Sequence, residues 1–285
     1  MREEGYMYSI DNKDSMTLLE FELHTEHVQK LHLDISLPPD AGFVGLKGRR
    51  VMIAGGVLPD FSTTKTAYII SASPIAVREI ASLPNESRKL RLVYDNDRRV
   101  FALGGVREKK EAISGSAFNF EYSKNFSVYS LDTNTWQSLP DLKQGTENPT
   151  AWISSDRIYV AGGAYSSGTL STNLDTVQFC SLVSFSWQIA NYSLPHPLHS
   201  LQAAVCSRGT FFFGGIDEND KDSRGTFLYT PQGYQELARL PLGCSCAFPT
   251  YTLMHSGEVL TINYDNTLCG LDLTSWAWSV QQGPN

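Results

Sequence analysis

Side chains that could do chemistry occur in short runs. The stretch 216–225 carries four carboxylates: Asp217, Glu218, Asp220 and Asp222. Carboxylate oxygens are the ligands that calcium prefers, but the stretch lacks the glycine and the terminal glutamate of an EF-hand loop. We therefore expect an acidic surface loop here rather than a calcium site.

Histidine and cysteine pairs give no stronger metal pattern. His196 and His199 stand three positions apart in HPLH, with no third ligand close in the sequence. Cys244 and Cys246 form a lone C-x-C, which is not a zinc motif. The chain also lacks Gly-x-Ser-x-Gly, a phosphate-binding loop and His-Glu-x-x-His. We predict no metal, no cofactor and no catalytic activity.

Cations and aromatic residues are mixed in the stretch 106–125. It contains Arg107, Lys109, Lys110, Lys124, Phe118, Phe120 and Tyr122. Arg and Lys recognise phosphate and acidic peptides, whereas a nucleic-acid surface needs a longer basic stripe. The formal net charge of −7 also speaks against nucleic acid. This stretch is typical of a contact for a charged protein or peptide.

These runs follow a repeated element, a short apolar strand that ends in two glycines. The glycine pairs fall at 55–56, 104–105, 162–163 and 214–215. A period of about fifty residues is typical of repeat architectures. Glycine at this point lets the chain take a positive φ and approach a neighbouring backbone closely.

Two further markers recur in each unit. Large residues stand seven positions apart around a polar turn, and they are Phe21/Val28, Tyr68/Ile75, Tyr129/Trp136, Cys180/Trp187, Phe227/Tyr234 and Cys269/Trp276. Leu-Pro closes five units, at 37–38, 83–84, 139–140, 194–195 and 240–241. Another apolar segment precedes every glycine strand except the first. Each unit thus supplies four short strands, and the first unit lacks its front strand.

Six such units predict an all-β fold of one domain, residues 1–285. We expect a six-bladed β-propeller of four-stranded antiparallel blades, with a first blade that is incomplete. The blades are expected at approximately residues 1–40, 41–87, 88–144, 145–198, 199–244 and 245–285. The aromatic residues of the fourth strands would fill the wedge between blades.

The glycine strand, the aromatic residue, the turn, the tryptophan and the Leu-Pro together resemble kelch repeats. The resemblance covers essentially the whole chain and is clearest in the units Gly104–Trp136 and Gly162–Trp187. The second unit departs by having Ile75 in place of tryptophan, and the end units lack the glycines. The resemblance implies a propeller of kelch type. It implies function only loosely, because one fold hosts many activities.

The missing front strand bears on how the ring closes, because kelch-like propellers usually let both termini share one blade. Here the first blade would be completed by residues 1–4, by sequence outside this chain, or by pairing with the last blade. We expect a domain of a larger polypeptide or complex. A natural chain with an incomplete first blade is the alternative.

The loops after the glycines and after Leu-Pro should emerge on one face, because strands in each blade alternate in direction. Long loops on a rigid scaffold commonly carry function. We expect this face to bind a protein or peptide segment, as an adaptor or substrate-receptor domain would. The expected contact residues are Phe61, Arg107, Lys109, Lys110, Phe120, Tyr122, Tyr165, His196, Asp217, Glu218 and Asp220. Ordinary solvated loops are the simpler reading of the same residues.

Two other functions stay open. Kelch-like propellers include galactose oxidase and sialic-acid mutarotase relatives, so a carbohydrate-type enzyme is one alternative. The six histidines do not form the copper set that the oxidase type needs, but a mutarotase type needs only a few Arg, Glu and His near the channel. A structural subunit of an assembly, bound along its blade edges, is the other alternative.

Composition sets the broad class. Hydrophobic residues make up 41% of the chain and charged residues 19%, which permits a large core. No apolar run reaches the length of a membrane span, and the stretch MREEGYMYSI lacks a signal-peptide core. Five scattered cysteines fit reduced thiols. We expect a cytoplasmic protein, in which the sequons at Asn85, Asn125 and Asn191 are chance matches.

Overall fold

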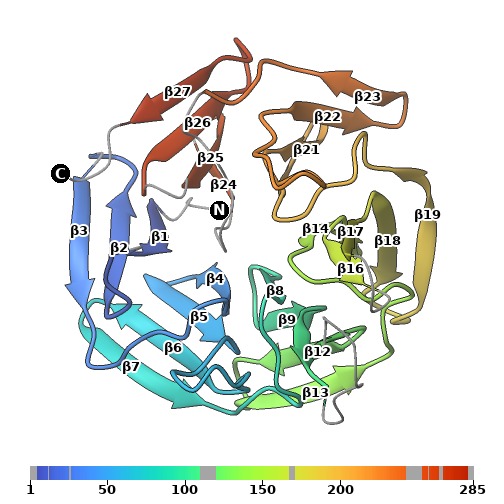
Figure 1. Ribbon diagram of the computed structural model, residues 1–285. Helices are drawn as coiled ribbons and strands as arrows, with labels where there is room; N and C mark the ends of the chain where they lie inside the picture. Colours follow the sequence, from blue (N-terminus) through green and yellow to red (C-terminus); the bar gives the residue numbers. More distant parts are fainter. Residues whose placement is uncertain are drawn as a thin grey trace.

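The computed structural model describes residues 5–11, 13–25, 27–109, 120–166, 171–241, 252–255, 257–262 and 266–281. All regular structure in these ranges is β. Six antiparallel sheets stand around a central axis as the blades of a propeller, as Figure 1 shows. The predicted fold class is confirmed. No helix in the described ranges could cross a membrane.

Five blades have four strands, numbered outward from the axis. The second blade has β4 (Gly42–Leu46), β5 (Arg50–Ala54), β6 (Ala67–Ala72) and β7 (Ile75–Ile80), and the third has β8 (Arg91–Tyr94), β9 (Arg99–Leu103), β12 (Phe126–Ser130) and β13 (Thr135–Leu139). The fourth has β14 (Thr150–Ser154), β15 (Arg157–Ala161), β18 (Thr176–Ser181) and β19 (Trp187–Ser193). The fifth has β20 (Gln202–Cys206), β21 (Gly209–Phe213), β22 (Thr226–Thr230) and β23 (Gly233–Glu236). The sixth has β24 (Leu253–His255), β25 (Glu258–Ile262), β26 (Leu268–Asp272) and β27 (Trp278–Gln281).

Among the described residues the first blade has three strands, β1 (Tyr6–Ile10), β2 (Thr17–Glu22) and β3 (His27–His32), as expected. It meets the sixth blade through side chains, with Met7 and Leu19 packed in one buried cluster with Leu260 and Ile262. The Ser9 hydroxyl also donates to the Asn266 side-chain oxygen, at 2.9 Å. Packing therefore joins these two blades. Residues 1–4, which were one candidate for closing the first blade, lie outside the described residues.

Tryptophans of three fourth strands, β13, β19 and β27, bond their blades to the blade before. The indole nitrogen of Trp136 in β13 donates to the Ala81 carbonyl beyond β7, at 2.8 Å. Trp187 in β19 donates in the same way to the Pro140 carbonyl, at 3.0 Å. The indole body is thereby buried in the wedge between blades while its polar edge keeps a partner.

The outer hairpins follow the predicted spacing in only part of the ring. Tyr129 and Trp136 are direct partners across the hairpin, as are Cys180 with Trp187 and Phe21 with Val28. In the second, fifth and sixth blades the residues that stand seven positions apart in the sequence motif are not direct partners, and the pairs in this place are Ile70/Val77, Tyr229/Tyr234 and Leu271/Trp278. Each first residue lies two positions after the first member of the motif. Because side chains alternate along a strand, a shift of two keeps the same face inward, so hydrophobicity alone does not distinguish the registers.

The glycine pairs hold the chain where it leaves the second strand of the second to fifth blades. Gly104 has a φ of +65°, and a Cβ placed there would come within 2.6 Å of the Thr146 carbonyl oxygen. The next N–H, that of Gly105, donates to the same carbonyl at 2.8 Å. Gly56 and Gly163 make the equivalent bonds to Ser87 and Leu198. The predicted need for close backbone approach is confirmed.

Candidate functional site

Strand registers place the glycine turns and the Leu-Pro connectors on one face. In the second blade, Ala54 at the end of β5 pairs with Gly42 at the start of β4 and with Ala67 at the start of β6. Ala67 in turn pairs with Ile80 at the end of β7. The end of β5, which leads to the glycines, and the end of β7, which leads to Leu-Pro, therefore lie at the same edge of the blade. We call this side the loop face.

A belt of backbone hydrogen bonds surrounds part of the channel opening on the loop face. Its four members are Asp40, Lys89, Asn148 and Ser200, and we call them the mouth belt. The N–H of Lys89 donates to Asp40, that of Asn148 to Lys89, and that of Ser200 to Asn148, at 2.7, 2.8 and 2.9 Å. All four have positive φ angles, between 48° and 58°. This conformation costs a non-glycine residue about 1 kcal/mol, and the belt's hydrogen bonds offset that cost.

The residue before each of the last three belt members pairs with the next blade. Arg88 forms an isolated antiparallel bridge with Val106, Glu147 with Ala164, and His199 with Ile216. The strand partners Val106, Ala164 and Ile216 each follow a glycine pair directly. The connector is thus held between two blades, and side chains at the mouth stand on fixed backbone.

The stretches after two of the glycine pairs are short hairpins. The third blade carries β10 (Val106–Glu108) paired with β11 (Phe120–Tyr122), and the fourth carries β16 (Ala164–Ser166) paired with β17 (Ser171–Asn173). The sequence predicted loops at both places. Of these four strands only Phe120–Tyr122 alternates apolar and polar residues, so the sequence carries little signal for the hairpins.

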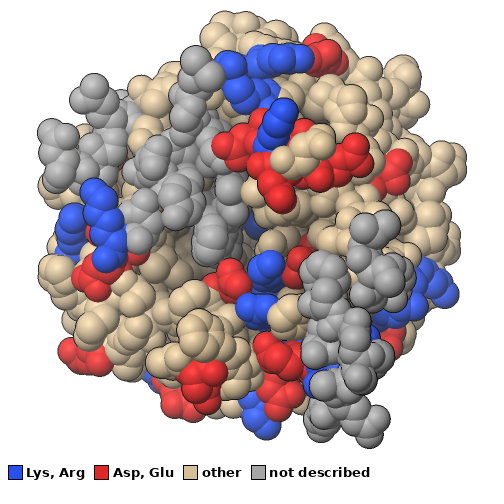
Figure 2. All heavy atoms as spheres, viewed as in Figure 1, with Lys and Arg blue, Asp and Glu red and all other residues tan. Residues whose placement is uncertain are grey.

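Charges of both signs meet at the mouth belt. The Arg88 Nη1 lies 3.7 Å from the Asp40 Oδ2, and the Lys89 Nζ lies 3.5 Å from the Glu147 Oε2. All four side chains are partly buried, with exposed fractions between 15% and 29%. Basic and acidic side chains gather beside the axis in Figure 2. The mouth therefore presents alternating charge rather than a single sign.

Three of the predicted contact residues lie together beside these charges. The Arg88 guanidinium stands over the Phe120 ring, 4.7 Å from its centre. The rings of Tyr122 and Tyr165 meet across the third and fourth blades, with their centres 5.5 Å apart. Burial raises the pKa of Tyr122, and the negative charge of Glu147 adds to that rise. The expected aromatic sector is present in this arrangement.

The expected basic sector is weaker than its sequence suggests. The Nε and Nη2 of Arg107 donate to the two carboxylate oxygens of Glu121 on the facing strand β11, at 3.0 and 3.1 Å. Its charge is thus largely offset within its own hairpin. Lys109 is partly buried at the end of β10, and Lys110 lies outside the described residues.

Three predicted residues lie away from the mouth belt or serve local structure. Phe61, at the tip of the β5–β6 loop, is 81% exposed. His196 packs edge-on against the Phe227 ring at 5.7 Å. Asp217 accepts the N–H groups of Lys221 and Asn219 at 3.0 and 2.8 Å, and these bonds lower its pKa. Its carboxylate therefore caps its own turn.

Glu218 and Asp220 are exposed in the same turn between β21 and β22. Figure 2 shows acidic side chains gathered over this loop. Within the part of the chain that the structure describes, no group of three His, Cys, Asp or Glu side chains is placed to hold a metal ion. Cys244 and Cys246 lie outside that part.

His199 belongs to the mouth and was absent from the predicted contact residues. Its Nδ1 lies 3.0 Å from the Ser200 hydroxyl. Burial lowers its pKa, and the positive charge of Lys89 lowers it further, while Asp220 acts in the opposite direction. The sequence held a usable signal, because His199 occupies the same repeat position as Arg88 and Glu147.

Comparisons with known proteins add no family. A scan against protein-family models gives no match to this chain, and a search of curated proteins gives no significant match. The resemblance to kelch repeats therefore rests on the recurring motif and on the six blades that it builds.

Proposed function

We propose that this chain is a non-catalytic protein-interaction module of the kelch type, which binds a peptide or protein segment across the mouth belt. The observation that carries the proposal is the mouth itself. Arg88, Lys89, Glu147 and His199 stand on hydrogen-bonded backbone from neighbouring connectors, beside the pair Tyr122 and Tyr165. Aromatic side chains and arginine are the residues that most often dominate binding energy at interfaces.

Alternating charge favours a partner of mixed charge. Each cation at the mouth already has a carboxylate at 3.5–3.7 Å. A ligand with charges of only one sign would therefore have to break one of these ion pairs in order to bind. An extended segment with acidic and basic residues in matching order can engage both pairs. Such complementarity fixes register and specificity more than it adds affinity.

The wider role that we propose is that of an adaptor or substrate receptor within a larger cytoplasmic protein or complex. The alternative of an assembly subunit held by its blade edges calls for an apolar patch on the outer strands. Exposed apolar residues on the described outer strands are Ile75, Ile189 and Val280, and they stand in alternate blades. Their separation favours the loop face over the rim as the contact surface.

One observation favours a carbohydrate-type enzyme as the second candidate. Arg88, Glu147 and His199 occupy equivalent positions on successive connectors, and a lowered pKa keeps His199 neutral at pH 7. A neutral imidazole can act as a general base. The ion pairs of Arg88 and Glu147 weigh against it, because a substrate would have to displace them. Thermal shifts with a panel of monosaccharides, lost on H199A, would support this candidate.

The test of the main proposal is a peptide selection followed by charge exchange. Peptides are selected from a random display library on the wild type, and their affinities are then measured for K89E, E147K and the double variant. We expect each single variant to weaken binding about tenfold or more, since it places like charges together. The double variant restores the pair and should recover part of the loss.

Arg98 provides a matched control for these variants. It forms an exposed ion pair with Asp132 on the opposite face, at 2.9 Å. R98E should leave peptide affinity unchanged. The proposal fails if no peptide is selected, or if R98E weakens binding as much as K89E does.

A further inference from the structure

A space beside the third strand recurs in successive blades. In the third, fourth and fifth blades one residue near the start of the third strand faces the Leu-Pro connector that enters the blade. Registers align these residues, because Phe126, Val177 and Thr226 before them pair with the last residues of β9, β15 and β21. The facing residues are Ser127, Gln178 and Phe227 in the third, fourth and fifth blades. We call the space that they face the connector slot.

The fourth blade shows which chemistry the slot satisfies. The side chain of Gln178, which is 2% exposed, fills it. Its Oε1 accepts the N–H groups of Lys143 and Gln144 at 3.0 and 3.3 Å, and its Nε2 donates to the Gln144 carbonyl at 3.0 Å. One primary amide thus meets both donors and an acceptor of the connector backbone.

The fifth blade fills the slot with a ring instead. Phe227 occupies it, and the cavity that remains beside Leu194, Pro195 and Leu198 measures only about 10 Å³. Side chains as different as Gln178 and Phe227 therefore fit the same backbone frame.

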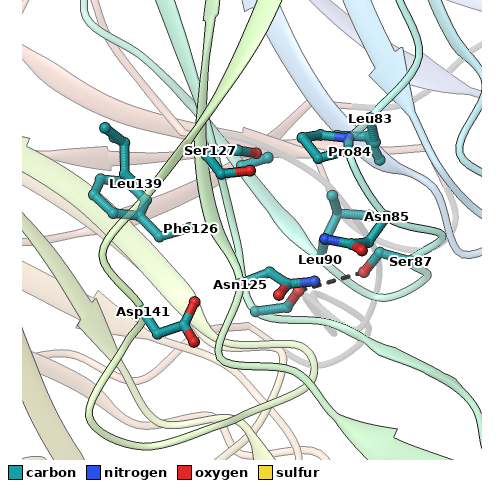
Figure 3. A pocket seen from close by; sticks show the side chains of 13 residues that line it. Leu83, Pro84, Asn85, Ser87, Leu90, Asn125, Phe126, Ser127, Leu139 and Asp141 are labelled. Carbon is teal, nitrogen blue, oxygen red and sulfur yellow. Dashed lines mark hydrogen bonds between the residues drawn. The ribbon is translucent and has the colours of Figure 1, made fainter.

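The third blade has the small side chain of Ser127 at this position, and a cavity of about 200 Å³ remains. Figure 3 shows its lining, in which Asn85, Asn125 and Asp141 extend toward the common space. The apolar part of the wall comes from Leu83, Pro84, Leu90, Ala102, Phe126 and Leu139. The volume suits one side chain of a partner rather than a large metabolite, because ligand pockets usually measure about 300–1,000 Å³.

The polar groups select among possible side chains. Asn85 lies four residues before Lys89 of the mouth belt, as Gln144 lies four residues before Asn148, so we infer that its backbone N–H and carbonyl face the slot in the same way. Pro84 replaces Lys143 and supplies no N–H, which removes one donor. The Asp141 carboxylate adds an acceptor at the rim. These changes favour a group that donates through –NH₂ and accepts once, and they disfavour a carboxylate.

We propose that the connector slot of the third blade binds the primary amide of a Gln or Asn side chain from the partner segment. The slot opens on the loop face, because it lies at the Leu-Pro connector and beside Gly104. The inference rests on the proposed function for its peptide context. It adds a specificity determinant at a place that no predicted contact residue occupies.

The test uses the fourth blade as its template. S127Q should fill the slot from within, as Gln178 does, and S127A should leave it open. We expect peptides selected on the wild type to be enriched in Gln or Asn at one position. S127Q should weaken their binding about tenfold or more, S127A should not, and replacing that Gln by Glu in the peptide should reproduce the loss.

A small probe separates this inference from the proposed function. N-acetyl-glutaminamide is titrated into ¹⁵N-labelled protein, and N-acetyl-glutamate amide is the control. We expect the glutamine probe to shift the amide resonances of Asn85 and Asn125 in the wild type but not in S127Q. If peptides bind with no amide preference and S127Q binds them normally, the slot inference falls while the proposed function stands. If the probe shifts the Asn85 resonance but no peptide is selected, the slot binds a primary amide and the proposed function falls.

Discussion

His199 illustrates how neighbours set the behaviour of one side chain at the mouth. Burial and the nearby Lys89 cation both disfavour the imidazolium, so its pKa lies below the ordinary value. A depressed pKa means that the native state binds this proton less readily than the unfolded chain does. The stabilisation is therefore complete above about pH 6.5 and is lost as the pH falls through the folded pKa.

An NMR titration of the imidazole protons tests this. We expect His199 to titrate below pH 6.5. K89M should raise the His199 pKa, but burial should still hold that pKa below the ordinary value. A His199 pKa at or above 6.5 in the wild type would contradict the assigned surroundings.

Glu20 is the most deeply buried carboxylate with an ion pair in the described part of the chain, at 3% exposed. It joins the first and second blades, because Arg49 in the β4–β5 turn donates to both of its oxygens and Tyr8 donates at 2.6 Å. R49M leaves this charge buried without its cation. We expect a loss of about 2–4 kcal/mol in the free energy of unfolding, measured by urea titration.

R98M is the matched control for R49M, since Arg98 pairs with Asp132 while 66% exposed. Its loss should stay within about 0.5 kcal/mol. Equal losses in the free energy of unfolding for R49M and R98M would show that the Arg49–Glu20 ion pair does not stabilise the contact between the first and second blades.

At the scale of elements, two threonines near the connector of the fourth blade make opposite predictions. The Thr146 hydroxyl donates to the Gly162 carbonyl at 2.9 Å, whereas the Thr150 hydroxyl at the start of β14 is fully buried without a hydrogen-bond partner in the structure. T146V should lower the free energy of unfolding by about 1 kcal/mol or more, and T150V should leave it unchanged or raise it by about 1 kcal/mol. Thermal and urea unfolding of both variants check this, and a costly T150V would reveal a missing partner for that hydroxyl.

The elements were largely predictable because each unit repeats strong local signals. Apolar strands ending in Gly-Gly, as at Val160–Gly163, and connectors opening with Leu-Pro mark the blades without reference to tertiary contacts. Hairpin register was less accessible, because Tyr68 and Ile70 share one face of β6 and either satisfies the pattern. Register is settled by turn geometry, which residue type constrains weakly here.

The candidate site was predictable in part, for a different reason. Aromatic residues such as Tyr122 and Tyr165 stood out by composition, and the structure brings them together. The offset of Arg107 by Glu121 depends on hairpin pairing, and the role of His199 depends on the connector's bridge to Ile216. Pairings across a ladder are invisible in a single sequence unless the repeat is aligned position by position.

At the scale of the whole molecule, the ring depends on the seam between the first and sixth blades. Met7 and Ile262 are fully buried there, although three strands make up the first blade in the part of the chain that the structure describes. We expect M7A to cost about 2–5 kcal/mol and to speed hydrogen exchange in β1 and β26 before the other blades. I75A, at an exposed outer position, is the control. Uniform acceleration in all blades would indicate that the seam is not the weakest part of the ring.

Hydrogen exchange of the wild type with a selected peptide bound tests the central claim, that the mouth belt is the recognition site. We expect slower exchange in the connector segments 88–90, 147–149 and 199–201 and in the hairpins β10–β11 and β16–β17, all on the loop face. Protection confined to the opposite turns, at 47–49, 95–98 and 155–156, would contradict the claim.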